Sequence, residues 1–590
     1  MGSMMASALR LAAAGAAARF ERAAGRPRAA QERLLCDILR SNAATAFGRE
    51  HGFATLRNSD DFRRAVPIRG YEALRPYVER IVAGEREVLT AEDPFMFALT
   101  SGTTAEPKLI PVTPAADRLG AALARQWLAR AATDHPDAFG GSQLMLVGRA
   151  VEAMTPAGTP CGSTSGMLYR RLPWAVRRVQ AVPYDVVDIA DYDTRYFVTL
   201  RFALGTSPRL VAAPNPSTLV HLAGVAATNA EALIRAVHDG TVGIASDDPA
   251  ISRLAARLDP DPRRARELER AAAQRGGFIP ANYWPDVKLI GCWTGGSAAL
   301  QLERLRRLYR PAAAVRDIGY LASEARMSLP LRDATPSGAL AIATNFYEFL
   351  PEEEREAAQP RTLLAHELEP GRRYRVLLTT AGGLYRYDIN DVVEVTGSYR
   401  GTPLVAFLRK GGDMANLTGE KLHVNQCLLA VKRAQTELGC AVVQCRFVPD
   451  PEALRYCVNI ELEDDADASA PALAEALDAA LCTANVEYRS KRQSRRLGAP
   501  VVRLMRRGWA EDAVRRHAAA RGRDIQFKWR SLVNEPVAED DAWFAPMPAD
   551  LSGVRQPAAP LPAWLRTAQG RGRGAIWAAA MGPVAALTSA

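Results

Sequence analysis

The stretch Phe97-Ala-Leu-Thr-Ser-Gly-Thr-Thr-Ala-Glu-Pro-Lys108 joins two apolar runs by a turn of small polar residues. The turn contains Thr100, Ser101, Gly102, Thr103 and Thr104. Glycine lets backbone N–H groups approach an anion, hydroxyl groups donate hydrogen bonds, and Lys108 adds a positive charge, so the turn has the chemistry of a phosphate-binding loop. A polar hairpin loop would have the same composition, and the Gly-x-x-x-x-Gly-Lys spacing of a Walker A loop is absent. This stretch alone leaves both interpretations open.

The composition of the chain predicts a globular protein with more than one domain. It has 590 residues, of which 48% are hydrophobic and 24% are charged. A single hydrophobic core does not grow to this length. No uninterrupted apolar run reaches about 20 residues, so we expect no membrane span. The net charge of +10 comes mostly from dispersed arginines, and with the alanine richness it indicates the base composition of a bacterial gene and no nucleic-acid binding.

The cysteines and lysines carry further information. The eight cysteines show no Cys-x-x-Cys pair and no ligand-type spacing with histidine. We therefore expect reduced thiols in a cytoplasmic protein. Only seven lysines occur. Because the chain otherwise uses arginine for positive charge, a retained lysine favours a position that needs a compact ammonium group.

Strand and helix patterns alternate over the first two thirds of the chain. Residues 115–133 form a strong helix pattern that Thr113 and Pro114 begin, and residues 155–185 read as irregular structure or a long loop. The predicted strands are 143–147, 209–213, 287–293, 314–320, 340–344 and 374–379, followed by hairpins over 385–408. This alternation predicts an α/β protein whose β-sheets are covered by helices.

The pattern changes at the glycine pair in 409–412, which has the composition of a hinge. A compact α+β pattern follows, with predicted helices over 423–438, 469–484 and 510–521 and predicted strands over 441–448, 456–462 and 501–505. We therefore predict a large N-terminal domain over residues 1–410 and a small C-terminal domain over residues 411–590.

Four turns with glycine or acidic residues each follow a predicted strand, at 100–108, 294–297, 320–324 and 387–391. In layered α/β folds, ligands bind at the carboxyl ends of strands. Four such turns with complementary chemistry could surround one nucleotide, with the first turn around its phosphates.

The other three turns supply the remaining parts of a nucleotide site. Gly295 and Gly296 have no side chains and would let the backbone approach a flat base, and Tyr320 offers a ring for stacking. Glu324 could hold Mg²⁺ near phosphates, and Asp391 could accept hydrogen bonds from ribose hydroxyls. Each turn alone also has an ordinary structural explanation, because a glycine pair is often only a turn and a polar strand end is often a solvated rim.

The three clearest motifs resemble those of the adenylate-forming enzymes. Ser101-Gly-Thr-Thr with Pro107-Lys108 resembles their first ATP motif, Tyr320-Leu-Ala-Ser323-Glu324 the second, and Tyr385-Arg386 through Asp391 the third. Within these enzymes the chain resembles the auxin-responsive acyl-acid amido synthetase family, of the Gretchen-Hagen-three type. Asp391 matches the motif better than Asp388 because two valines follow it. The sequence departs from the family at Ala105-Glu106, where glycine is commoner, and at 419–423.

The resemblance implies an adenylate-forming fold, in which a large domain of helix-covered sheets with a β-barrel-like part carries a small mobile α+β domain. It implies ATP and Mg²⁺ as cofactors, adenylation of a carboxylic acid with release of pyrophosphate, and transfer of the acyl group to an amine, releasing AMP. Lys528 resembles the family's catalytic lysine near the end of the chain, Lys421 a lysine near the hinge, and Glu324 the metal ligand. We expect a monomer with small-molecule substrates.

Aromatic residues suggest an acyl pocket between residues 115–185 and a predicted turn at 345–349. Its candidate lining residues are Tyr169, Trp174, Phe346 and Tyr347. They would favour an aromatic or aliphatic acid. Two other functions remain open at this point: transfer of the acyl group to a thiol of coenzyme A or a carrier protein, and nucleotide binding without catalysis.

Overall fold

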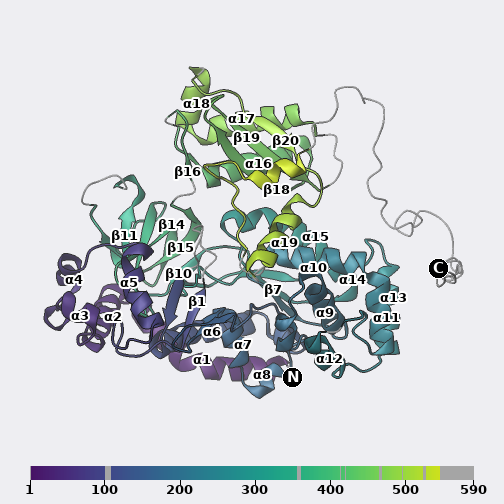
Figure 1. Ribbon diagram of the computed structural model, residues 1–590, viewed down its shortest axis with the longest axis horizontal. Coiled ribbons are helices and arrows are strands. Elements are labelled where there is room, and N and C mark those ends of the chain that lie inside the picture. The colour runs from purple at the N-terminus through teal and green to yellow at the C-terminus, as the bar shows by residue number, and fades with distance from the viewer. Residues whose placement is uncertain are drawn as a thin grey trace, which may run out of the picture. The chain divides into compact units, whose positions relative to one another are not determined.

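A computed structural model describes residues 2–99, 108–246, 248–354, 360–411, 414–418, 420–463, 468–494, 496–521 and 527–544 (Figure 1). The first compact unit of the chain ends at Phe544. Within this unit helices and strands alternate along the chain, so the predicted α/β fold class is confirmed. The predicted domain division at residue 411 stays a prediction. No helix of the described residues is both long and apolar enough to cross a membrane.

The N-terminal helices pack around a shared aromatic core. They are α1 (Gly2–Ala24), α2 (Pro27–Ser41), α3 (Ala46–Glu50), α4 (Ser59–Ala65) and α5 (Tyr71–Val82). Helix α5 buries Tyr71, Leu74, Val78 and Ile81, and this spacing places all four on one helix face. Helix α3 begins after its N-cap Thr45, whose hydroxyl accepts a hydrogen bond from the N–H of Gly48.

A short sheet holds the two strands that flank the predicted phosphate-binding loop. Strand β1 (Met96–Leu99) pairs antiparallel with β2 (Leu109–Val112), and Leu99 lies opposite Leu109. Strands β5 (Pro160–Gly162) and β4 (Ala153–Met154) complete this sheet. The predicted loop residues Thr100, Ser101, Gly102, Thr103 and Thr104 lie outside the described residues, so only the two ends of the loop are placed.

The central sheet is parallel, with the order β3-β6-β7-β8. Its strands are β3 (Gln143–Met145), β6 (Leu210–Ala212), β7 (Leu289–Cys292) and β8 (Ala314–Asp317), all within predicted strands. Leu200, Leu219 and Ile290 share one hydrophobic core, which packs the helices against the sheet. The carboxyl ends of β7 and β8 therefore lie side by side and point their following turns to the same edge.

Helices cover this sheet and fill the connections between its strands. They are α6 (Pro114–Asp134), α7 (Thr164–Arg170), α8 (Trp174–Arg177), α9 (Tyr192–Leu204), α10 (Pro216–Thr228), α11 (Ala230–Asp239), α12 (Pro249–Ala255), α13 (Pro262–Ala272), α14 (Pro280–Tyr283) and α15 (Leu302–Leu308). The hydroxyl of Thr113 accepts a hydrogen bond from the N–H of Ala116, so the predicted start of α6 is confirmed. The predicted irregular segment 155–185 is partly wrong, because it contains β5, α7 and α8.

A seven-stranded antiparallel sheet follows, in the order β12-β11-β13-β14-β15-β10-β9. Its strands are β9 (Ser328–Pro330), β10 (Gly338–Leu340), β11 (Phe346–Pro351), β12 (Leu363–Leu364), β13 (Arg373–Thr379), β14 (Tyr387–Tyr399) and β15 (Thr402–Lys410). Two predictions fail here. The strand predicted over 340–344 is mostly a turn, and the turn predicted over 345–349 is the strand β11, which is buried along its whole length.

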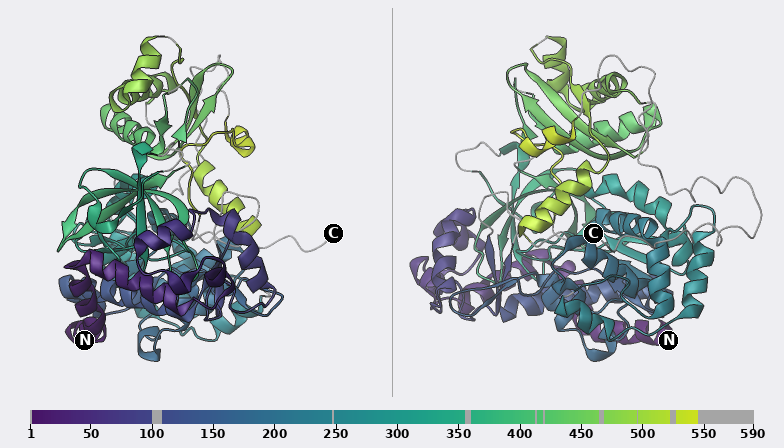
Figure 2. Two further views of the ribbon diagram at one scale, coloured as in Figure 1. Left: turned by 90° about the vertical axis from the view of Figure 1, so that its left-hand side faces the viewer. Right: turned by 45° about the vertical axis from the view of Figure 1, so that its right-hand side comes forward.

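The C-terminal part is an α+β layer, as the sequence predicts. Strands β18 (Val442–Asp450), β19 (Arg455–Leu462) and β20 (Val501–Leu504) form a sheet, beside the short pair β16 (Met414–Ala415) and β17 (Leu422–His423). Helices α16 (Val424–Leu438) and α17 (Ala470–Ala484) pack together on one face of that sheet (Figure 2). Two further helices are α18 (Val486–Gln493), which was not predicted, and α19 (Trp509–Arg521).

Candidate functional site

A cavity of about 1330 Å³ lies where the turns after β7 and β8 meet residues 389–391 of β14. The turn predicted over 387–391 is wrong, because these residues belong to that strand. Its lining includes seven of the predicted site residues, which are Lys108, Gly295, Tyr320, Ser323, Glu324, Asp391 and Lys528. These residues come from segments that span more than 400 positions of the sequence. The structure therefore brings the described ends of all four predicted turns, and the distant lysine, to one place.

A buried aspartate that the sequence prediction missed fixes two of these turns. The Asp317 carboxylate, with 3% of the residue exposed, accepts hydrogen bonds from the backbone N–H and the hydroxyl of Thr294, both at 2.7 Å. Its other oxygen accepts from the N–H of Gly319 at 2.6 Å. Burial raises the pKa of the Asp317 carboxyl, and these hydrogen bonds oppose the rise. Asp317 therefore links the turns after β7 and β8.

Replacing Asp317 with alanine is expected to lower the free energy of unfolding by roughly 2–4 kcal/mol, because each buried donor left unsatisfied costs about 1–3 kcal/mol. Urea denaturation followed by circular dichroism measures this loss. The matched control is Asp286→Ala, since Asp286 is an exposed aspartate just before β7; its removal should change stability by less than about 0.5 kcal/mol. Equal stabilities of the two variants would show that Asp317 does not hold the turns.

Tyr320, Asp391 and Lys410 form a polar chain at the edge of the cavity. The Tyr320 hydroxyl donates to Asp391 Oδ2 at 2.7 Å, and the Lys410 ammonium pairs with the other carboxylate oxygen. Burial and the Asp391 charge hold the pKa of Tyr320 well above its usual value, so the phenol stays a donor. Each carboxylate oxygen has two lone pairs, so Asp391 keeps capacity to accept from a ligand.

The two aspartates of the third motif point in different directions. Asp388 accepts from the Arg375 guanidinium, with Nε at 3.1 Å, and Asp391 lines the cavity. Residues three positions apart on a strand lie on opposite faces, because side chains alternate. This agrees with the choice of Asp391 over Asp388 as the motif residue.

Glu324 is a half-buried carboxylate on the cavity wall. The Tyr387 hydroxyl lies 3.4 Å from its Oε1 atom. Within the described part of the chain, no cluster of three or more histidine, cysteine or acidic residues is arranged to hold a metal. Mg²⁺ usually binds one or two carboxylates and completes its shell with water and phosphate oxygens. A lone Glu324 on the wall of this cavity fits that donor set.

The glycine pair has a structural role that differs from the predicted one. A Cβ atom on Gly295 would lie 2.9 Å from Cβ of Pro336, and Gly296 adopts φ +58° beside Leu408 and Phe407. Gly295 is therefore required by the close approach of Pro336, and Gly296 by its positive φ. Tyr320 likewise stacks on Phe407, with ring centroids 5.6 Å apart, so one face of its ring is already covered.

Lys108 and Lys528 both line the cavity, although they are far apart in the sequence. The Lys108 ammonium lies 5.5 Å from the centre of the Tyr71 ring, and that of Lys528 lies 5.3 Å from the centre of the Trp293 ring. Trp293 is held by a hydrogen bond from its Nε1 to the carbonyl of Gly319 at 3.2 Å. Both cations therefore lie over aromatic rings, which favour a positive charge.

A cluster that was not predicted anchors the Lys528 segment. Arg446 pairs with Asp540, with Nη1–Oδ1 at 2.5 Å, and its guanidinium lies 4.4 Å from the centre of the Trp529 ring. Trp509 donates to Asp540 at 2.8 Å, and the Trp529 indole donates to the carbonyl of Cys445 at 2.7 Å. One feature of the sequence could have indicated this cluster. Trp529 directly follows Lys528, and a buried tryptophan usually needs a hydrogen-bond partner for its indole N–H.

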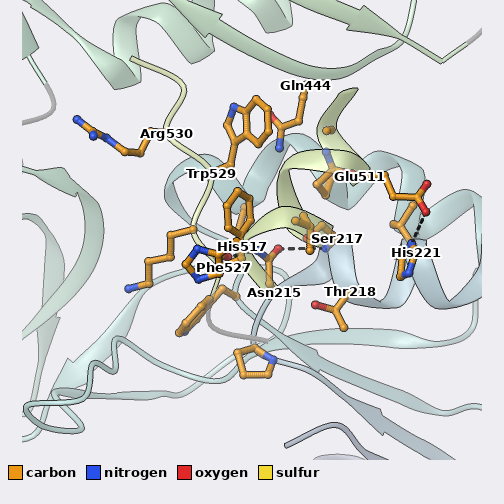
Figure 3. Close-up of a pocket in the computed structure, with 18 of the residues that line it drawn as sticks. Asn215, Ser217, Thr218, His221, Gln444, Glu511, His517, Phe527, Trp529 and Arg530 are labelled. Atoms are coloured by element: carbon orange, nitrogen blue, oxygen red, sulfur yellow. Dashed lines mark hydrogen bonds and ion pairs between the residues drawn. The ribbon is translucent and has the colours of Figure 1, made fainter. Parts of the chain in front are cut away.

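Figure 3 shows the segment around Lys528 beside α10, one of the helices that cover the parallel sheet. Phe527 and His517 lie close together, with ring centroids 5.1 Å apart. The Asn215 amide, just before α10, donates to the carbonyl of Phe527 at 3.3 Å. Phe527, the residue before Lys528, is therefore hydrogen-bonded to the N-cap residue of α10.

Six of the predicted site residues that the structure describes do not line this cavity, and Gly296 is one of them. Lys421 is exposed and does not line it, and Trp174 is 64% exposed beside Arg178. Tyr169 is buried and donates to the carbonyl of Val182 at 2.8 Å. Phe346 and Tyr347 are fully buried in the core that β11 shares with the N-terminal helices. Apolar aromatic residues serve cores and pockets equally well, so composition alone could not separate the two.

The comparison with known families covers most of the chain. Residues 16–312 match the GH3 family N-terminal domain, residues 338–410 the GH3 family central domain, and residues 425–537 the GH3 family C-terminal domain. A probable indole-3-acetic acid-amido synthetase of Oryza sativa subsp. japonica, GH3.2, is 26% identical over 558 residues, covering 87% of this chain and 89% of that protein. The jasmonoyl–L-amino acid synthetase GH3.5 of the same plant is 25% identical over 540 residues, covering 85% and 92%.

A solved structure has the same fold over nearly the whole length. The GH3.15 acyl acid amido synthetase in complex with 2,4-DB superposes with a TM-score of 0.78 and 19% identity, covering 90% of this chain and 96% of that one. The fold, the matched domains and the converging motif turns agree with one another. The chain belongs to the GH3 family.

Proposed function

We propose that this protein is an ATP-dependent acyl-acid amido synthetase, which adenylates a carboxylic acid and passes the acyl group to the amine of an amino acid. The observation that carries the proposal is the convergence of Lys108, Tyr320, Glu324, Asp391 and Lys528 on one cavity. Curated relatives of similar length are named as amido synthetases, which supports an amine as the acceptor over a thiol.

The side chains divide the chemistry of the first step between them. Attack of a carboxylate on the α-phosphate needs positioning and charge neutralisation more than covalent chemistry by the protein. Lys108, at the end of the phosphate-binding loop, neutralises phosphate charge, and Lys528 meets the charge that develops during attack. The carboxylate of Asp391 accepts from the ribose hydroxyls. Glu324 holds Mg²⁺, which neutralises phosphate charge when bound.

Several finer assignments stay predictions within this proposal. A cytoplasmic location is supported by the absence of a disulfide among the eight cysteines, all of which are described. Lys421 is exposed in this structure, so a catalytic role for it requires a movement that brings it to the cavity. A bacterial source and a monomeric state rest on the sequence alone.

The function is tested by a screen of carboxylic acids against amino acids, with pyrophosphate release as the readout and mass spectrometry of the products. We expect at least one pair to give an amide and AMP with no thiol present. If hydroxylamine traps an activated acyl group yet no amino acid turns over, the acceptor assignment is wrong. If no acid releases pyrophosphate, adenylation itself is wrong.

Replacing Asp391 with asparagine is expected to raise the KM for ATP by about ten-fold with a smaller change in kcat, since ribose contacts act equally in the ground state and the transition state. Steady-state kinetics of pyrophosphate release separate the two constants. Asp388→Asn is the matched control, because Asp388 lies on the same strand and does not line the cavity. A large loss of kcat with an unchanged KM for ATP would contradict the ribose assignment.

A further inference from the structure

The carboxyl ends of β6, β7 and β8 each contribute one residue to the surroundings of Lys528. Asn215 follows β6, Trp293 follows β7 and Gly319 follows β8. These three residues and Lys528 all line the cavity. Neighbouring parallel strands place the residues that follow them at one edge of the sheet. The surroundings of Lys528 are therefore built on the edge of the parallel sheet.

The side chain of Trp293 is held in place by two hydrogen bonds. Its backbone N–H donates to the carbonyl of Pro214 at 2.8 Å, and its indole N–H donates to the carbonyl of Gly319 at 3.2 Å. The Lys528 ammonium lies over the ring, 5.3 Å from its centre. A tryptophan ring attracts an ammonium group within about 6 Å. The fixed ring therefore gives the ammonium a preferred position on the cavity wall.

Asn215 holds the backbone just before the lysine. Its side-chain amide donates to the carbonyl of Phe527 at 3.3 Å, and its Oδ1 atom accepts from the N–H of Ser217 at 3.1 Å and caps α10. On the other side of Lys528, the indole of Trp529 donates to a backbone carbonyl of β18 at 2.7 Å. The two residues that flank the lysine are therefore held by different parts of the chain.

We propose that Trp293 and Asn215 are positioning residues for adenylation that act through Lys528, with Trp293 orienting its ammonium and Asn215 fixing its backbone. The inference rests on the proposed function, in which Lys528 meets the charge that develops on the phosphate. A lysine has a flexible four-carbon stem, and a misplacement of about 1 Å can cost roughly 100-fold in rate. Two contacts that restrict the stem therefore raise the rate without touching the reacting atoms.

The first test replaces the ring and measures pyrophosphate release with an acid that the screen identifies. Trp293→Leu keeps an apolar side chain and should lower kcat by about ten-fold with the KM for ATP unchanged. Trp293→Phe keeps a ring and should recover most of the rate. Trp174→Leu is the control, since Trp174 is exposed and does not line the cavity. A raised KM for ATP or the acid at constant kcat would place Trp293 against a ligand and overturn its positioning role.

The second test separates the two hydrogen bonds of Asn215. Serine caps a helix about as well as asparagine, but its shorter side chain does not reach the carbonyl of Phe527. We therefore expect Asn215→Ser to lower kcat by about five-fold, the effect of one hydrogen bond, and to leave the free energy of unfolding in urea unchanged. Full kcat in this variant would remove Asn215 from the inference.

Double variants distinguish positioning from a general structural role. Because both residues act through Lys528, neither Trp293→Leu nor Asn215→Ser should lower the rate further in a protein that already carries Lys528→Ala. Independent effects would instead add, and each replacement would lower the rate of Lys528→Ala by the same factor as in the unaltered protein. Additive losses would overturn the inference.

Chemical labelling separates this inference from the proposed function. Trace acetic anhydride, without ATP, acetylates only neutral amines, and the Trp293 ring favours the ammonium form of Lys528. Mass spectrometry should show Lys528 acetylated about three-fold faster or more in Trp293→Leu, with Lys432, exposed on α16, unchanged. If no acid releases pyrophosphate but this difference persists, the proposed reaction is wrong and the contact between Trp293 and Lys528 stands. Equal acetylation of Lys528 in both proteins overturns the contact even where adenylation is observed.

Discussion

Replacing Lys528 with alanine is expected to lower the kcat of acid-dependent pyrophosphate release by roughly 10²–10³-fold, the loss that follows when one preorganised charge partner of a transition state is removed. The Lys528 ammonium lies 5.3 Å from the centre of the Trp293 ring, and both residues line the cavity. The charge that it meets is larger in the transition state than in bound ATP. We therefore expect the KM for ATP to change less than kcat.

The controls for Lys528 rest on its surroundings. Trp529 and Arg446 anchor the next residues of the segment, so removal of one exposed side chain leaves the segment in place. Lys432→Ala, on the exposed face of α16, should retain full activity. Lys528→Arg keeps the charge but changes its geometry and should recover only part of the rate. Unaltered kcat in Lys528→Ala would remove this lysine from the mechanism.

Local signals in the sequence predict most of the elements and the position of the site. The cap at Thr113, the apolar runs of β6, β7 and β13, and the change of pattern near residue 410 each depend on residues close together in the chain. The site follows from a rule of the same kind, since turns after parallel strands gather at one edge of a sheet. That rule brings Tyr320 and Glu324, which follow the parallel strand β8, to the wall of the cavity, whereas Asp391 reaches the same cavity from the antiparallel strand β14.

The supporting contacts could not be predicted, because their partners are far apart in the sequence. Asp317 carries no pattern that marks it as the partner of Thr294, and Arg446 carries none for Asp540, 94 positions away. The prediction of the acyl-pocket residues failed for a related reason. Tyr347 and Tyr196 have the same side chain, but Tyr347 is buried in the core and Tyr196 lines the cavity. Only the packing of β11 and α9 decides this difference.

The largest expected loss of stability comes from a residue of the third motif that never reaches the cavity. Arg386 is 6% exposed and Glu348 is 1% exposed. The Arg386 guanidinium donates to Glu348 at 2.8 and 2.9 Å and to the carbonyls of Arg63 and Val66 at 3.0 and 2.7 Å. It thus connects β11, the start of β14 and the C-terminal end of α4.

Arg386→Met is expected to lower the free energy of unfolding by about 3–5 kcal/mol, because it leaves the Glu348 carboxylate buried without its main charge partner. Urea denaturation measures the loss. The double variant Arg386→Met/Glu348→Leu also removes the buried Glu348 carboxylate. It should therefore be more stable than the single variant, since replacing a buried pair by apolar residues is often close to neutral.

An exposed ion pair provides the control for this stability measurement. Arg235 and Glu231 lie four residues apart on α11 at 2.7 Å, with both side chains mostly exposed, and Arg235→Ala should cost no more than about 0.5 kcal/mol. Burial is the physical difference between the two pairs, because water screens the exposed charges and cannot reach the buried ones. If the double variant were as unstable as Arg386→Met, the loss would come from the bonds of Arg386 to the Arg63 and Val66 carbonyls. The arginine of this motif would then stabilise the fold through backbone contacts and not through its charge.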